Sequence, residues 1–109
     1  MRSTKPASSK RASLPREWRY TKRFHSEWTA LSRSGRYDMV RAKEVIMALI
    51  ANDAPLSAEW LDHPLKGEWA GHRECHIGGD FLLIYRVDAR GAEEVITFIA
   101  MGTHSQLFK

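Results

Sequence analysis

The 109-residue chain has a single cysteine, so it cannot form an internal disulfide, which suits the reducing cytoplasm. It has no run of about 18 apolar residues, so no segment is predicted to cross a membrane. No apolar stretch follows the basic N-terminus, as a secretory signal would require. The patterns G-x-x-x-x-G-K, G-x-G-x-x-G and G-x-S-x-G are all missing, so phosphate-loop, dinucleotide-binding and serine-hydrolase functions have no support. We therefore expect a cytoplasmic protein of another class.

Basic residues are concentrated at the N-terminus. Residues 1–27 hold eight Lys or Arg and two Glu, whereas residues 28–109 hold nine Lys or Arg and eleven Asp or Glu. Residues 1–16, MRSTKPASSKRASLPR, contain no acid and too few apolar side chains to bury themselves. We predict a disordered basic tail over residues 1–16 and one folded domain over residues 17–109. A basic arm is typical of contact with RNA, DNA or an acidic protein.

The first half of the domain reads as one strand followed by two helices. Residues 17–21 alternate between aromatic and polar side chains, which predicts a short strand. Apolar residues then recur with helical spacing up to a stop signal, Ser-Gly, at 34–35. Asp38 is a suitable N-cap for a second helix, which the sequence NDAP at 52–55 ends. The two helices are expected to form an α-hairpin.

The second half reads as a long loop and three strands. The loop covers residues 56–71, with one helical turn predicted at 58–61. Three β-rich segments follow, separated by turns at 78–79 and 88–92: they are 72–77, 81–87 and 95–101. The predicted fold class is α+β with two layers and the order β-α-α-β-β-β, in which the helical hairpin covers one face of an antiparallel sheet.

Four residues of this second half are candidates for proton transfer. Imidazoles both accept and donate protons near pH 7. Cleaving RNA without a metal needs such a pair, because a base must deprotonate the 2′-OH and an acid must protonate the leaving 5′-oxygen. The candidates are His63, His76, Asp80 and His104. The alternative is that the histidines are structural and that the acid is favoured by its turn.

Other side chains are candidates for binding a phosphate or a base. Cationic groups offset phosphate charge, and aromatic rings stack on splayed bases. The candidates for substrate binding are Lys66, Arg73, Phe81, Arg86 and Phe108. For Phe81, at the start of an apolar strand, core packing is the alternative.

A metal site is not expected. His72, Cys75 and His76 are possible ligands by residue type, but the period of two in a strand directs Cys75 away from the two histidines. A second soft ligand is also missing. We therefore predict neither a metal nor a cofactor.

The segment DHPLKGEWAGHRECHIGGDFLLIYRV, followed by GTHSQLF, resembles the YafQ-like branch of the RelE/ParE superfamily of type II toxins. The resemblance covers roughly Tyr20 to Phe108. It is carried by D-H-P-L, G-x-W-x-G-x-R-x-x-H, D-aromatic-L-L-I-Y and G-[TS]-H-x-x-L-F in combination. It implies the same fold order and an endoribonuclease that cuts mRNA in the ribosomal A site without a metal. The implied partners are a cognate antitoxin, the ribosome with its mRNA, and operator DNA through the antitoxin complex.

The resemblance also implies roles for individual residues. His104 becomes the candidate general acid, while His63, His76 and Asp80 share the base, orienting and transition-state roles. The family's two aromatic positions fall on Phe81 and Phe108.

The chain departs from the family pattern in three places. Ala100 stands where many members have an arginine that supports the scissile phosphate, and Lys66, Arg73 and Arg86 are the candidates to replace it. Gly79 stands where proline is common. The basic N-terminal extension is the third departure.

Two other functions remain open at this point. A toxin-like module that has lost cleavage would act by binding antitoxin, operator DNA or the ribosome, and Ala100 motivates that hypothesis. A gyrase-directed poison of the ParE type is the other, although blocking gyrase does not call for proton-transfer groups.

Overall fold

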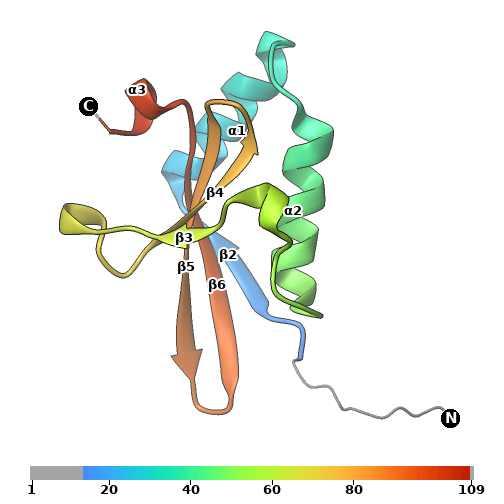
Figure 1. The fold of residues 1–109 in the computed structure, drawn as a ribbon, viewed down its shortest axis with the longest axis vertical. Coiled ribbons are helices and arrows are strands. Elements are labelled where there is room, and N and C mark those ends of the chain that lie inside the picture. The colour runs from blue at the N-terminus through green and yellow to red at the C-terminus, as the bar shows by residue number, and fades with distance from the viewer. Residues whose placement is uncertain (1–13, 109) are drawn as a thin grey trace, which may run out of the picture.

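The computed structural model describes residues 14–108, which form a sheet with helices (Figure 1). The strands are β2 (Glu17–Tyr20), β3 (His63–Pro64), β4 (Arg73–Gly78), β5 (Phe81–Arg90) and β6 (Glu93–Gly102). The helices are α1 (Lys22–Ser34), α2 (Met39–Ala51) and α3 (His104–Leu107), with 3-10 turns η1 (Ala58–Trp60) and η2 (Gly67–Trp69). The predicted α+β fold is confirmed, with β3 and α3 as additions. Within this described part, no helix has the length and apolar character needed to cross a membrane.

The sheet has the strand order β2-β6-β5-β4-β3. Strands β4, β5 and β6 form the predicted antiparallel meander. Strand β2, however, pairs with β6 in parallel, with Glu17 opposite Val95. The expectation of a wholly antiparallel sheet was therefore wrong. Parallel pairing is possible because the helical hairpin and three strands separate β2 from β6, so no tight turn fixes their relative direction.

Local signals set both the start and the end of each long helix, and the two ends lie where the sequence predicts. The Thr21 hydroxyl accepts a hydrogen bond from the Phe24 amide at the start of α1, and Gly35 ends that helix at φ 69°. Asp38 accepts from the Arg41 amide at the start of α2, which ends at Asn52. These caps satisfy amides that have no partner inside the helix.

The main core lies between the helical hairpin and one face of the sheet. Figure 1 shows α1 and α2 on the same side of the strands. The buried side chains of this layer include Phe24, Leu31, Val45, Leu49, Cys75, Ile77, Leu83, Ile96 and Phe98. Alternate residues of each strand thus face the helices, as the period of a strand requires.

A smaller cluster lies on the opposite face of the sheet. There Leu82 and Ile84 of β5 pack with Ala100 and with Leu107 of α3. Both faces of β5 are therefore covered, and residues 81–85 are all buried. This explains why FLLIY is the most apolar run of the chain. We call the side of the sheet that carries α3 the open face, because neither long helix covers it.

The predicted element bounds differ from the observed ones at two places. The predicted turn at 88–92 shrinks to Gly91-Ala92, because exposed polar residues continue the β5–β6 pairing up to Arg90 opposite Glu93. The predicted loop 56–71 contains the expected helical turn as η1, but also β3 and η2. Short elements such as β3 are fixed by their neighbours in the fold and carry no sequence period.

Ordered contacts begin before the predicted domain boundary. Residues 1–13, most of the predicted tail, lie outside the described residues. The Arg16 amide donates to the Ile50 carbonyl at 2.8 Å, and its guanidinium donates to the Leu49 carbonyl at 2.8 Å and to Glu94 at 2.9 Å. Arg16 therefore belongs to the folded unit and holds its start against the end of α2.

Replacing Phe98 with alanine should destabilise the domain strongly. Its ring is 1% exposed and lies 5.8 Å from the ring of Phe24, between the sheet and α1. We expect Phe98→Ala to lower the free energy of unfolding by about 3–5 kcal/mol in urea denaturation. Met47→Ala is the control, because Met47 is 62% exposed and should cost under about 0.5 kcal/mol. Equal losses in the two variants would contradict this assignment of the core.

Candidate active site

The open face of the sheet carries two histidines and a glutamate on neighbouring strands. His63 of β3 pairs with Glu74 of β4, and His76 lies two residues further along β4. Leu82 and Ile84, their cross-strand partners on β5, form an apolar floor. Glu74 and His76 therefore share one face of β4, as the period of two in a strand requires.

Glu74 is the centre of this group. Its side chain is 4% exposed, and its Oε2 lies 3.3 Å from the Nε2 of His63 and 3.3 Å from the Nε2 of His76. The two imidazole rings are 6.1 Å apart between centroids. A buried carboxylate needs polar partners around it, and here two imidazole nitrogens lie within ion-pair distance of it. The carboxylate thus fixes the direction in which both rings point.

Backbone geometry fixes the second nitrogen of His63. Its Nδ1 lies 2.8 Å from the carbonyl oxygen of Leu61, a residue in the left-handed region at φ 49°. A carbonyl only accepts, so Nδ1 carries a proton in this arrangement. His63 therefore presents a donor to Leu61 on one side and its other nitrogen to Glu74 on the other.

A second acid–imidazole pair lies at the end of the chain. Asp80 accepts a hydrogen bond from the His104 amide at 3.1 Å and is also paired with Nδ1 of the same residue. His104 begins α3, whose start is held by a capping box between Thr103 and Gln106. These bonds from His104 lower the pKa of Asp80. The pairing leaves Nε2 of His104 as the nitrogen that can exchange a proton with a substrate.

The turn that carries Asp80 explains one departure from the family pattern. Gly79 has φ 52°, in the left-handed region that glycine adopts readily. Proline is held near φ −65° and cannot take this conformation. Glycine at position 79 therefore gives a different turn from the one that a proline would allow.

His76 lies between the Glu74 group and the Asp80–His104 pair. The rings of His76 and His104 are 6.2 Å apart between centroids. The structure thus brings together all four predicted proton-transfer residues, which come from β3, β4, the β4–β5 turn and α3. It adds Glu74, which we did not nominate from the sequence. The signal was present, because alternation places Glu74 on the same strand face as His76.

The predicted aromatic binders have separate locations. Phe108 is half-buried with its ring 5.8 Å from that of His104, so it lies at the site. Phe81 does not: it is 5% exposed and packs 4.9 Å from the ring of Tyr37 on the helix side. Its prediction as a base-stacking residue at the rim was wrong, because the alternation along β5 turns its side chain into the main core.

The three basic side chains predicted to bind phosphate also lie in different places. Arg73 extends to the helix side, away from the histidines, where its Nε and Nη2 donate to Asp62 Oδ2 at 3.1 and 2.7 Å. This bond raises the pKa of Arg73, and the prediction that it binds the scissile phosphate is not supported by its position. Arg86 lies on the open face and contacts Asp88 at 2.8 Å. Lys66 is exposed at the start of η2.

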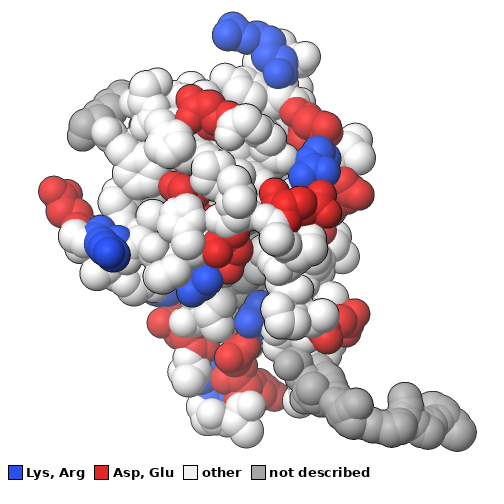
Figure 2. Space-filling model, in the orientation of Figure 1, with Lys and Arg blue, Asp and Glu red and all other residues white. Residues whose placement is uncertain are grey.

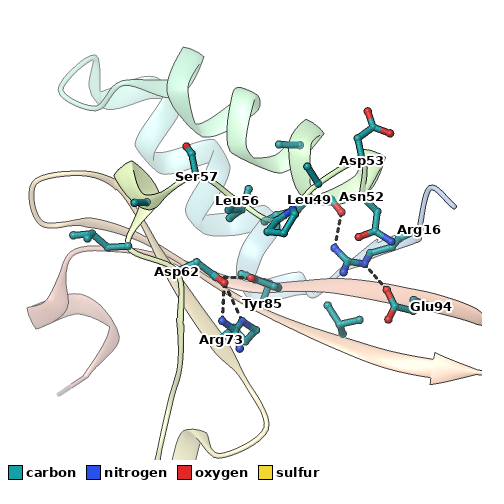
Figure 3. A pocket seen from close by; sticks show the side chains of 16 residues that line it. Arg16, Leu49, Asn52, Asp53, Leu56, Ser57, Asp62, Arg73, Tyr85 and Glu94 are labelled. Atoms are coloured by element: carbon teal, nitrogen blue, oxygen red, sulfur yellow. Dashed lines mark hydrogen bonds and ion pairs between the residues drawn. The ribbon is translucent and has the colours of Figure 1, made fainter. Parts of the chain in front are cut away.

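Asp62 anchors the segment that carries His63. Besides Arg73, it accepts a hydrogen bond from the Tyr85 hydroxyl at 2.5 Å, as Figure 3 shows. Burial, followed by this bond, raises the pKa of Tyr85. We call Asp62, Arg73 and Tyr85 the clamp. It lines a cavity of about 780 Å³ beside the end of α2, on the face opposite to the histidines.

Three of the site residues could hold a metal ion. One ligand atom each from His63, Glu74 and His76 lies within 4.8 Å of the others, and two imidazoles with a carboxylate suit zinc or copper. The set considered from the sequence was different, and Cys75 does not take part because it is fully buried on the helix side. Burial raises the pKa of its thiol. The absence of a metal in the working protein stays a prediction.

The chain is similar to known bacterial toxins over most of its length. The sequence profile of the family described as "Bacterial toxin of type II toxin-antitoxin system, YafQ" matches residues 16–109. The "mRNA interferase toxin YafQ" of Escherichia coli K12 is 36% identical over 84 residues, which cover 77% of this chain and 87% of that protein.

Solved structures show the same likeness in three dimensions. The Escherichia coli DinJ–YafQ complex contains a chain that is 33% identical, with a TM-score of 0.74 over 86% of this chain and 99% of that one. A copper-bound mutant toxin from Helicobacter pylori is 34% identical, with a TM-score of 0.74 over 84% and 98% of the two chains.

The clamp should stabilise the domain more than an exposed ion pair does. Asp62→Asn removes a carboxylate that holds a guanidinium and a phenol, so we expect a loss of about 1–3 kcal/mol in urea denaturation. Asp88→Asn is the matched control, because the Arg86–Asp88 pair is exposed and should contribute under about 1 kcal/mol. NMR of the His63 ring should change only in Asp62→Asn. Equal losses in both variants would show that the clamp anchors nothing.

The Asp80–His104 pair should be visible in a carboxyl titration. Because the pKa of Asp80 is lowered from its ordinary 3.8, its stabilising effect is present above that value and is lost as the pH falls through the lowered pKa. Carbon-detected NMR should find the Asp80 midpoint below 3.8 in the parent chain and closer to 3.8 in His104→Ala. An unchanged midpoint in the variant would show that the pair does not form in solution.

Proposed function

Because the chain belongs to the YafQ family of toxins from bacterial type II toxin–antitoxin systems, we propose that it is an mRNA interferase, an endoribonuclease that inhibits translation by cutting mRNA on the ribosome. One observation carries the proposal. Three imidazoles lie beside one another along the open face of the sheet, and each has a carboxylate oxygen within ion-pair distance. That arrangement suits general acid–base catalysis.

The contacts of the ring nitrogens indicate which histidine is suited to be the base. When Nε2 of His76 donates to Glu74, its Nδ1 carries the lone pair that can take a proton from the 2′-OH. His63 is engaged on both nitrogens, by Leu61 and Glu74, so it is suited to orienting the group and to offsetting negative charge. We therefore assign His76 as the general base.

His104 is the general acid in this proposal. The 2′-oxygen attacks the phosphorus, the bond from phosphorus to the 5′-oxygen breaks, and His104 donates a proton from Nε2 to that oxygen. The products are a 2′,3′-cyclic phosphate and a 5′-hydroxyl. Asp80 holds Nδ1 and stabilises the protonated ring before transfer. The 6.2 Å between the His76 and His104 rings suits a base and an acid on either side of one phosphate.

The family is the basis on which we propose partners and a location. A solved relative is a complex of YafQ with DinJ, and we propose a cognate antitoxin for this chain as well. We further propose that it acts in the cytoplasm and that it contacts operator DNA only through the antitoxin complex. Figure 2 shows acidic and basic residues intermixed on the face in view, which favours local rather than whole-face recognition of RNA.

A non-cleaving toxin is the second candidate. It is favoured by Ala100, which is fully buried under α3 and adds no charge to the site. Such a protein would inhibit translation by binding the ribosome while mRNA stays intact. The gyrase-directed alternative gives no reason for three oriented imidazoles.

Mapping of mRNA 5′ ends in a cell-free translation reaction tests the proposal. We expect new in-frame ends with the parent chain, none without ribosomes, and a rate lower by about 10²–10⁴-fold with His76→Ala or His104→Ala. His25→Ala, an exposed residue of α1 outside the site, is the matched control and should keep the parent rate.

Each contrary result has a distinct meaning. Inhibited translation without new ends would favour the non-cleaving toxin. Cuts that persist at the parent rate in His104→Ala would show that the acid is wrongly assigned. Neither cuts nor inhibition would overturn the toxin activity itself.

A further inference from the structure

A basic side chain from α1 reaches the open face beside the site. Helix α1 begins where β2 ends, and the Thr21 amide and hydroxyl donate to the Phe98 and Ile99 carbonyls of β6 at 3.1 and 2.7 Å. The first turns of α1 therefore lie along the edge of β6. From there the guanidinium carbon of Arg23 reaches a position 6.0 Å from the ring centroid of Trp69, which packs on the open face.

A carboxylate holds this guanidinium in place. Glu27 Oε2 accepts from Arg23 Nε at 3.0 Å, while its Oε1 accepts from the Met101 amide at 2.9 Å. Met101 lies three residues before His104, at the end of β6. The position of Arg23 is thus tied to the strand that delivers the proposed acid. The bond to Glu27 uses Nε and the Arg23 side chain is 44% exposed, so its two terminal nitrogens remain available to donate together to an anion.

Aromatic rings connect Arg23 to the site. The Trp69 ring contacts that of Phe108 edge to face at 5.8 Å, and the Phe108 ring lies 5.8 Å from that of His104. Both Trp69 and Phe108 are half-buried, so part of each ring is accessible. A guanidinium beside accessible rings combines the two contacts that single-stranded RNA makes with proteins, phosphate pairing and base stacking.

We propose that Arg23, Trp69 and Phe108 form a subsite for one nucleotide of single-stranded RNA next to the cleavage position. Arg23 binds the phosphate of this nucleotide, and its base stacks on the face of one ring while the other ring, which is nearly perpendicular to the first, contacts its edge. The proposal rests on the proposed function for its biological role. It also identifies a cation near the site where Ala100 supplies none and Arg73 points away. The competing explanation is that Arg23 only packs on Trp69 and stabilises the fold.

The test compares Arg23→Gln with Arg33→Gln in the full-length chain. Both changes remove one arginine from an exposed position of α1, but Arg33 lies in the last turn, ten residues beyond Arg23. The probe is a fluorescent, mixed-sequence, 2′-O-methylated RNA that the proposed mechanism cannot cut. Binding is measured by fluorescence anisotropy over a series of salt concentrations, and thermal unfolding is measured in parallel.

We expect Arg23→Gln to raise Kd about tenfold at low salt and to flatten the slope of log K against log salt by about 0.7. Arg33→Gln should show a smaller effect on Kd, with both variants melting at similar temperatures. The same Kd and slope in the two variants, or no binding by the parent chain, would overturn the subsite. A lower melting temperature of Arg23→Gln with unchanged binding would support the packing explanation instead.

This experiment separates the subsite from the proposed function. RNA binding that depends on Arg23, together with a parent chain that cuts no mRNA, would keep the subsite and overturn the nuclease. Cleavage on ribosomes that is lost in His104→Ala but unaffected in Arg23→Gln would keep the nuclease and overturn the subsite.

Discussion

The site depends on a carboxylate that the sheet keeps out of water. Glu74 is almost fully buried, yet it lies on the open face and not in the main core, because two imidazoles and an apolar floor cover it. Burying a carboxylate away from water costs free energy unless polar partners surround it. The Nε2 atoms of His63 and His76 lie 3.3 Å from its Oε2, so the need of one buried carboxylate for polar partners places two imidazoles beside it.

Side chains alternate between the two faces of the sheet along β4 and β5, so neighbouring residues belong to different groups. On one face, Glu74 and His76 form the site. On the other face, Arg73 joins the clamp, and Cys75 and Ile77 pack against the helices. A shift of one residue in the pairing of β4 would exchange these sets. The helix-side core therefore sets, from the other face of the sheet, the register that the site requires.

The sequence was most informative where local chemistry decides the structure. The helix stops at Gly35 and Asn52 and the cap at Asp38 follow from backbone preferences of single residues. The grouping of His63, His76, Asp80 and His104 came from residue type and from the family pattern.

Contacts between distant segments could not be read in the same way. The parallel pairing of β2, the burial of Phe81 against Tyr37 and the capture of Arg73 by Asp62 each depend on which segments meet in space. The alternation of β4 places Glu74 on the face of His76, so its position could be predicted. Its role could not, because it also depends on His63, which lies in a segment with no sequence period.

The placement of His104 has a consequence for how the protein could be disarmed. The proposed acid belongs to a four-residue helix that follows the last strand, and the main core includes none of its side chains. A chain shortened after Gly102 would keep the helical hairpin, the clamp and the Glu74 group, but would lack both His104 and Phe108. The seven residues after Gly102 therefore carry the proposed acid without taking part in the main core, and their removal would also uncover Leu82 and Ile84, on which Leu107 packs.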